Sequence, residues 1–177
     1  MPPNNASMIW RTMHERDLPA VVAIAGQVHP DYPESPAVFA ERLQLFAAGC
    51  RVVVDERDHA HGYAITHPAM LGQAPALNSL LHALPPQADC LYLHDVALTE
   101  ATRQYGLGGK LVELMRRHAV TMQFGHAALV AVNGSAGYWR RRGFADYLQA
   151  DAALLKKIAS YDSDARYLVL DVARTGS

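Results

Sequence analysis

One segment limits the choice of fold more than any other: the glycine-rich turn Arg103-Gln104-Tyr105-Gly106-Leu107-Gly108-Gly109-Lys110, between an apolar run and a long amphipathic one. A helix that begins near Gly106 leaves its first backbone N–H groups unpaired at the positive end of the helix dipole. Such an end binds phosphate, because glycine lets the backbone approach an anion closely and Arg103 and Lys110 add positive charge. The turn therefore predicts a strand–turn–helix unit with an anion site.

Two common phosphate-binding motifs do not fit this turn. A P-loop would need a glycine where Gln104 stands and a hydroxyl residue where Leu111 stands. A dinucleotide-binding fingerprint would also need a small residue at Leu111. What remains is the pattern R-x-x-G-x-G, formed by Arg103, Gly106 and Gly108.

The segments around the turn predict an α/β protein. An apolar strand over Leu91–Leu98 leads into the turn, and a helix over about Gly106–Met122 follows it. Because the early strands are joined by a hairpin and the later ones by helices, the sheet should be mixed. The other expected elements are a strand Ser7–Met13, helices over Leu18–Ala25 and from Ser35 to Gly49, hairpin strands Cys50–Asp55 and Gly62–His67, a connection over 68–89 with at most a short helix at Ala76–Ala83, a strand Ala127–Val132, helices near Ala136–Arg142 and Asp151–Ala159, and a strand Tyr167–Val172.

Length, composition and charge set the class of protein. The 177 residues fit one domain over 1–177, with residues 1–6 as a loose tail, and 50% of them are hydrophobic. A chain of this length and composition can bury a core that needs neither metal nor disulfide to stabilise it, so Cys50 and Cys90 are interpreted as buried small hydrophobic residues. The 16 basic residues nearly balance the 17 acidic ones, which leaves no global field for nucleic acid or an anionic membrane. Without a signal peptide or an apolar run of about 18 residues, we expect a cytoplasmic protein.

A second segment extends the pattern. Residues 132–144, VNGSAGYWRRRGF, place two aromatic residues, Tyr138 and Trp139, before the pair Gly143-Phe144. With R-x-x-G-x-G and the order of the elements, the chain resembles the GNAT family of acetyl-CoA-dependent N-acetyltransferases over roughly residues 7–172. The resemblance implies a GNAT acyl-CoA N-acyltransferase fold: a central mixed, mostly antiparallel sheet flanked by helices, with a splayed strand pair that binds CoA. It also implies transfer of an acetyl group from acetyl-CoA to a primary amine by direct attack in a ternary complex.

Carried over position by position, the resemblance implies a coenzyme site. The backbone amides of Gln104 through Gly109 would cradle the CoA pyrophosphate, and Val96 and Leu98 would pair with the pantetheine arm as a neighbouring strand does. Asn133 would hold that arm from the next strand end. Arg142 would contact the phosphates, although a charged run on a short helix is also typical of a solvated face. The implied cofactor-binding residues are Val96, Ala97, Leu98, Arg103, Gln104, Tyr105, Gly106, Leu107, Gly108, Gly109, Lys110, Asn133, Ser135, Tyr138 and Arg142.

The strand before the turn carries the candidate catalytic base. An alkylamine of pKa about 10.4 is only about one part in two thousand neutral at pH 7, so the reaction needs a proton acceptor. His94 is the leading candidate, because an imidazole suits this role and some GNAT members carry a histidine at this strand position. Strand alternation places Tyr92 and His94 on one face and Asp95 on the other. Asp95 and Glu56 are lesser candidates, and His94 as a hydrogen-bonded core residue stays open.

The second signature carries the candidate acid. The family's usual acid is a tyrosine four residues before the glycine of the Gly-Phe pair, and Trp139 occupies that position. An indole cannot release a proton at useful pH. Tyr138, one residue earlier, is the candidate, but adjacent helical residues point about 100° apart, so it reaches the sulfur only if the helix is rotated. Water is the alternative proton source, and a backbone N–H near Leu98 would meet the oxyanion.

Motifs of other functional classes fit the sequence less well. The segment Asn133–Gly137 nearly matches the G-x-S-x-G elbow of serine hydrolases, but its first position is not glycine and no histidine follows His126. The histidines form no ligand set, so we expect no metal. The open alternative is a non-catalytic module of the same fold that binds acyl-CoA as a sensor. The preferred acceptor is a small-molecule amine, although the segment expected beside it, the loop His29–Pro33 with parts of the helix from Ser35, is neither strongly acidic nor strongly basic. A homodimer is possible, and no nucleic acid or membrane partner is expected.

Overall fold

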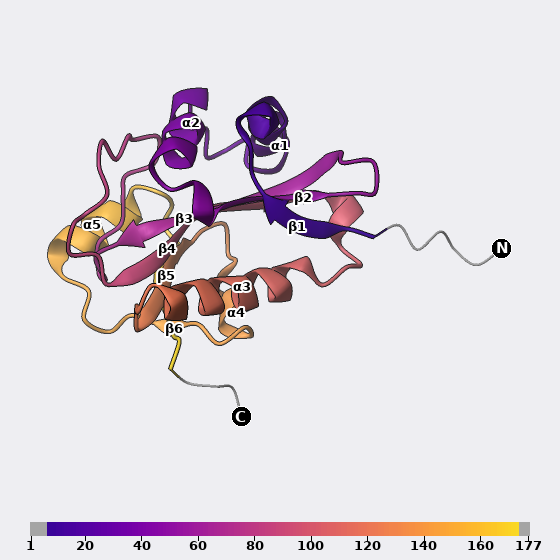
Figure 1. Ribbon diagram of the computed structural model, residues 1–177. Helices are drawn as coiled ribbons and strands as arrows, with labels where there is room; N and C mark the ends of the chain where they lie inside the picture. Colours follow the sequence, from indigo (N-terminus) through magenta and orange to yellow (C-terminus); the bar gives the residue numbers. More distant parts are fainter. Residues whose placement is uncertain (1–6, 174–177) are drawn as a thin grey trace.

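A seven-stranded sheet organises the protein, shown in Figure 1 as a computed structural model that describes residues 7–173. The strand order is β1-β2-β3-β4-β5-β7-β6, and each neighbouring pair is antiparallel except β4 and β5. The mixed, mostly antiparallel sheet is therefore confirmed. The strands are β1 Ile9–Thr12, β2 Cys50–Val54, β3 Ala60–Ala69, β4 Cys90–Leu98, β5 His126–Ala131, β6 Ala145–Asp146 and β7 Arg166–Asp171.

Helices cover both faces of this sheet. In Figure 1, α1 and α2 lie on one side of it, and α3 and α4 lie on the other. The side chains of β4 alternate accordingly: Leu91 and Leu93 pack in the cluster that contains α3, whereas Tyr92 packs with residues of α5. The helices are α1 Leu18–Val28, α2 Pro36–Leu45, α3 Leu107–Thr121, α4 Ala136–Arg140 and α5 Ala152–Ala159, and short 3₁₀ turns lie at η1 Glu15–Asp17, η2 Ala47–Gly49 and η3 Glu100–Thr102.

The connection between β3 and β4 is held in place by α2. It contains no helix, and its backbone is instead bound by two neighbouring side chains of α2. Glu41 accepts hydrogen bonds from the N–H groups of Leu81 and His82, and the fully buried Arg42 donates one of 3.1 Å to the Ser79 carbonyl. The hairpin of β2 and β3 and the helix after the glycine-rich turn are confirmed, and the tail over residues 1–6 lies outside the described residues.

A bulge interrupts the pairing of β4 with β3. Ile65 pairs with Asp95, but the next residue, Thr66, pairs with Leu93, so His94 has no partner across the ladder. A bulge of this kind bends its strand and re-aims side chains. The parallel ladder between β4 and β5 also ends at Leu93, and β4 continues alone on that side. The splayed strand pair that the resemblance implied is therefore present.

Gly49, in the turn η2 after α2, packs closely against Thr66 of β3. A Cβ atom there would collide with the Thr66 carbonyl oxygen and the Phe46 ring, neither of which can move freely. We expect Gly49→Ala to lower the free energy of unfolding by about 1–3 kcal/mol, the usual cost of overpacking. Urea unfolding measures this change. Gly26→Ala is the matched control, because a Cβ atom at Gly26 meets nothing within 4 Å; equal stability of the two variants would contradict the prediction.

Candidate functional site

A cavity of about 530 Å³ opens where β4 leaves β5. Its wall is built from the second half of β4, the start of α3, α4 and the loop between α1 and α2. Most candidate residues line it: His94, Asp95, Val96, Leu98, Arg103, Gly106, Leu107, Gly108, Asn133, Ser135, Tyr138 and Arg142. The other described candidates, Ala97, Gln104, Tyr105, Gly109 and Lys110, are not part of its wall. The fold thus gathers segments that are far apart in the sequence around one space.

The start of α3 forms one end of the cavity, here called the anion end. Gly106 has a φ of +63°, in the left-handed region that favours glycine, and no side chain caps the helix. The first helical hydrogen bond runs from the N–H of Lys110 to the Gly106 carbonyl. The N–H groups of residues 107–109 therefore lie outside the helical ladder. Arg103 is exposed nearby, 3.6 Å from Glu100, so this end suits a phosphate group.

Two side chains near α4 lie against the anion end. A Cβ atom at Gly108 would collide with the Tyr138 hydroxyl. The Arg142 guanidinium lies 3.5 Å from the centre of the Tyr138 ring and donates a hydrogen bond of 2.9 Å to the Tyr138 carbonyl. The Arg142 Nε is buried without a hydrogen-bond partner among the described residues, which leaves a donor for a ligand. Trp139 is buried against Phe144, in keeping with a packing role.

The second half of β4 offers backbone groups to the cavity. Val96 and Leu98 line it, whereas Ala97 is buried with Tyr63 in the cluster under α1. The Val96 carbonyl accepts a hydrogen bond of 2.8 Å from Nε2 of His29, at the end of α1. A carbonyl oxygen has two lone pairs, so this bond leaves room for a second donor.

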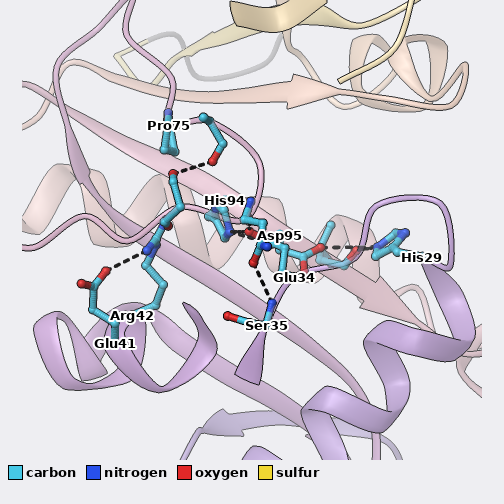
Figure 2. Close-up of polar contacts among 12 residues, drawn as sticks. His29, Glu34, Ser35, Glu41, Arg42, Pro75, His94 and Asp95 are labelled. Carbon is cyan, nitrogen blue, oxygen red and sulfur yellow. Dashed lines mark hydrogen bonds and ion pairs between the residues drawn. The ribbon is translucent and has the colours of Figure 1, made fainter. Parts of the chain in front are cut away.

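The opposite end of the cavity, here called the acid–base end, centres on His94 and Glu34 (Figure 2). His94 Nε2 lies 2.8 Å from Glu34 Oε1, and the two side chains are 2% and 5% exposed. Burial acts to raise the pKa of Glu34, but its hydrogen bond with and attraction to His94, the hydrogen bond from the Asn78 N–H and the nearby charge of Arg42 together outweigh burial and lower that pKa. The other ring nitrogen of His94, Nδ1, is buried and has no hydrogen-bond partner within residues 7–173.

Sequence reasoning missed Glu34. It lies 60 residues before His94, in the loop between α1 and α2, and no motif connects the two positions. The segment expected on the acceptor side was the loop His29–Pro33 with parts of the helix from Ser35, and Glu34 lies between these two parts. A carboxylate beside an expected acceptor loop was the available signal, and it was too general to single out one residue.

Asp95 lies on the same face of the sheet as His94, so the prediction that it points to the opposite face is wrong. The bulge inserts one residue, which turns both side chains towards α1 and the loop after it. Asp95 accepts a hydrogen bond of 2.5 Å from the Tyr63 hydroxyl and lies 3.4 Å from His29 Nε2. Burial raises the pKa of Asp95. The lesser candidate Glu56 is exposed in the turn between β2 and β3 and does not line the cavity.

Hydrogen bonds between loops enclose the acid–base end. The Tyr32 hydroxyl donates one of 2.6 Å to Asp162, in the loop between α5 and β7. Asp162 also accepts the backbone N–H of Asn133 at 2.9 Å, just after β5. The Tyr161 hydroxyl donates to the Pro75 carbonyl in the connection between β3 and β4. The loop between α1 and α2 is therefore bridged to the end of β5.

Several further expectations concern features away from the cavity. Cys50 and Cys90 are free and buried, and burial raises the pKa of each thiol to about 12. No group of three or more His, Cys, Asp or Glu side chains within residues 7–173 is placed to hold a metal ion. None of the helices in the described part of the chain has the length and apolar character to cross a membrane.

Comparison with known proteins identifies the fold. No profile of a known family matches the sequence, and no curated protein sequence matches it. Among solved structures, the GNAT-like decarboxylase GphF in complex with isobutyryl-CoA is similar at a TM-score of 0.73 and 16% identity, over 93% of this chain and 99% of that chain. A chain of the NatC complex bound to Gag peptide and CoA gives 0.66 and 15%, over 93% and 98%. The ribosomal-protein-S18-alanine N-acetyltransferase from Escherichia coli gives 0.63 and 16%, over 97% of each chain; this chain therefore has the GNAT fold.

Binding of the coenzyme at the anion end can be tested by substitution of Gly109, where an added side chain meets no other part of the protein. A Cβ atom at Gly109 meets no atom within 4 Å, so a side chain there leaves the free protein undisturbed, whereas one at Gly108 would displace Tyr138. We expect Gly109→Val to reduce the rise in melting temperature caused by acetyl-CoA, because its branched side chain crowds the unpaired N–H groups of the first turn of α3. A thermal-shift titration measures this. Gly26→Val, another exposed helical glycine, should keep the full shift; an undiminished shift in Gly109→Val would refute the assignment.

Proposed function

We propose that this protein transfers an acetyl group from acetyl-CoA to the amine of a small molecule, by direct attack of the amine in a ternary complex. One observation carries the proposal: a single cavity joins an uncapped helix start to a buried carboxylate–imidazole pair. The helix start suits the phosphates of CoA, and the pair suits an amine that must lose a proton. The fold supports this donor, because structures with the same fold were solved with CoA or isobutyryl-CoA.

In this proposal different residues along the cavity bind different parts of the coenzyme. The N–H groups of residues 107–109 hold the pyrophosphate, with Arg103 and the unpartnered Nε of Arg142 as additional donors. The backbone of Val96 and Leu98 pairs with the pantetheine arm, and Asn133 holds it from the end of β5. The thioester would then lie in the splay between β4 and β5, close to His94.

The reacting groups follow from that placement. His94 accepts the proton that the acceptor loses, so the neutral amine can attack the acetyl carbon as the C–N bond forms. A backbone N–H near Leu98 meets the negative charge on the carbonyl oxygen. When the C–S bond breaks, the sulfur takes a proton from Tyr138 or from water. The Tyr138 hydroxyl lies against Gly108 at the anion end, and the Tyr138 side chain is part of the cavity wall.

The charge at the acid–base end supports an amine acceptor. Glu34 and Asp162 both have lowered pKa values: burial opposes ionisation, but hydrogen bonds from His94 and from Tyr32 outweigh it. Both carboxylates are therefore ionised at neutral pH, and Glu34, which lines the cavity, attracts an ammonium group. The same fold also occurs in a decarboxylase, so the fold does not decide the reaction. A decarboxylase needs a substrate carboxylate, which Glu34 would repel.

The bridge between the loops supports a small acceptor. Proteins of this fold include one solved with a peptide and one named for a ribosomal protein, so the fold is compatible with protein acceptors. In this chain the hydrogen bond from Tyr32 to Asp162 crosses between the loops that a polypeptide would have to pass. A small amine fits behind the bridge, whereas a peptide would have to break it.

The acceptor class can be tested by turnover. We expect release of CoA from acetyl-CoA with small primary amines. For the amine of a peptide, kcat/KM should be roughly tenfold or more lower, because the bridge excludes the rest of the peptide. Tyr32→Phe removes the bridging hydroxyl and should reduce the ratio of kcat/KM for small amines to kcat/KM for the peptide. Saturable acetyl-CoA binding without turnover of any amine would favour the non-catalytic sensor, and faster turnover of peptides would overturn the small acceptor.

The base can be tested by His94→Gln. With an accepted amine, we expect the rate of acetyl transfer to fall by about a hundredfold, because a positioned proton acceptor is lost, while acetyl-CoA affinity changes little. The acidic limb of the pH–rate profile should disappear in the variant. His59→Gln, on an exposed histidine outside the cavity, is the control and should behave like the parent. An unchanged rate and pH–rate profile in His94→Gln would show that His94 is a core residue and not the base.

A further inference from the structure

We infer that Glu34 is a positioning residue that fixes the tautomer of His94, so that Nδ1 is the basic nitrogen of the ring. The inference rests on the proposed function for its catalytic meaning. Its geometric basis is the contact between His94 Nε2 and the two carboxylate oxygens of Glu34, at 2.8 and 3.1 Å. Both side chains are almost fully buried, so water does not compete for this contact.

The tautomer follows from donor and acceptor rules. An ionised carboxylate can only accept hydrogen bonds, so the Nε2 of His94 must carry the hydrogen. A neutral imidazole has one N–H, so its lone pair for a proton lies on Nδ1. Nδ1 is buried without a hydrogen-bond partner in the described part of the chain, and His94 lines the cavity. An unpartnered buried acceptor is costly and rare in folded proteins, which supports a functional role for it.

Glu34 also balances the charge that proton transfer creates. When Nδ1 takes a proton from the acceptor ammonium, the ring becomes an imidazolium that still donates its Nε2–H to the carboxylate. The positive charge on the ring then faces the negative charge of Glu34 across 2.8 Å, in a site with little water. The amine that remains forms its bond to the acetyl carbon and loses its second proton as the C–S bond breaks; this proton balances the one that the sulfur takes up, and the proton on Nδ1 is returned to solvent.

The carboxylate is held rigidly enough for this role. Its second oxygen accepts the N–H of Asn78 at 3.1 Å, and the Asn78 side chain in turn accepts the N–H of Ser35 at 2.8 Å. Asn78 belongs to the connection that Glu41 and Arg42 of α2 hold in place. Figure 2 shows this polar network, with Glu34 beside His94 and the pair of α2 residues on one side. The loop, the connection and α2 thus fix the position of one carboxylate.

Other titratable groups near His94 do not replace Glu34. His67 of β3 lies with its ring 6.2 Å from the His94 ring, and burial lowers its pKa to about 4, so it is neutral near pH 7. Asp95, the next residue along β4, is bound to Tyr63. The titratable and charged groups that surround the pair are Arg42 of α2, His67 of β3, Tyr92 and Asp95 of β4, and Tyr161 after α5.

The tautomer can be measured without any reaction. In the full-length protein labelled with ¹⁵N-histidine, the chemical shifts of the ring nitrogens distinguish N–H from a lone-pair nitrogen, and His94→Gln identifies the His94 signals by their loss. At a pH where the ring is neutral, we expect the hydrogen on Nε2. A hydrogen on Nδ1 would overturn the inference. Because no acceptor is needed, the result stands even if no amine proves to be a substrate, which separates this inference from the proposed function.

The catalytic consequence is tested with Glu34→Gln, which keeps the shape and an oxygen acceptor but removes the charge. With an accepted amine, we expect turnover at pH 7 to fall about tenfold or more and the acidic limb of the pH–rate profile to move to lower pH. Acetyl-CoA stabilisation should be unchanged. Glu113→Gln is the matched control: this exposed carboxylate of α3 pairs with Arg117 and lies outside the cavity wall, so its profile should keep the parent's shape. An unshifted profile in Glu34→Gln, or an equal shift in Glu113→Gln, would contradict the positioning role.

Discussion

One inserted residue in β4 determines how the rest of the site is built. His94 has no partner on β3, and the parallel ladder with β5 stops at the residue before it. Beyond that point the strand is paired on one side only, so the backbone of Val96 and Leu98 lines a cavity instead of a ladder. The same insertion brings two consecutive side chains, His94 and Asp95, to one face. With strict alternation only one of them would reach the acid–base end.

The two ends of the cavity solve different electrostatic problems. At the anion end the groups that suit a charged ligand are backbone N–H groups, whose partial charges need no counter-ion. At the acid–base end the protein buries a full charge on Glu34, which is stable only because His94 and Asn78 bind both of its oxygens. This second solution depends on contacts between distant segments, and the buried Arg42 extends it into α2. The acid–base end is therefore the part of the site most sensitive to changes elsewhere in the fold.

The sequence predicted those parts of the structure that depend on local rules. The glycine pattern around Gly106 and the amphipathic run after it placed α3 within one residue at each end, because a helix start is determined by neighbouring residues. The bulge could not be predicted in this way, since it arises from the register between β3 and β4, and the face assigned to Asp95 was wrong for that reason. Glu34 was missed because its role exists only through a contact across 60 residues. Local pattern likewise did not show that the Tyr138 hydroxyl contacts Gly108.

Because both cysteines are buried, a free thiol such as that of CoA can be measured beside this protein with little background from the protein itself. The chain has only two cysteines, and burial raises the pKa of each to about 12. At pH 8 about one in ten thousand of such groups is a thiolate, the form that attacks disulfide reagents. Free CoA has an ordinary, accessible thiol, so a chromogenic disulfide reagent would report the liberated coenzyme with little signal from the native protein. A sudden rise in that background would in turn reveal unfolding, since only loss of the core exposes Cys50 and Cys90.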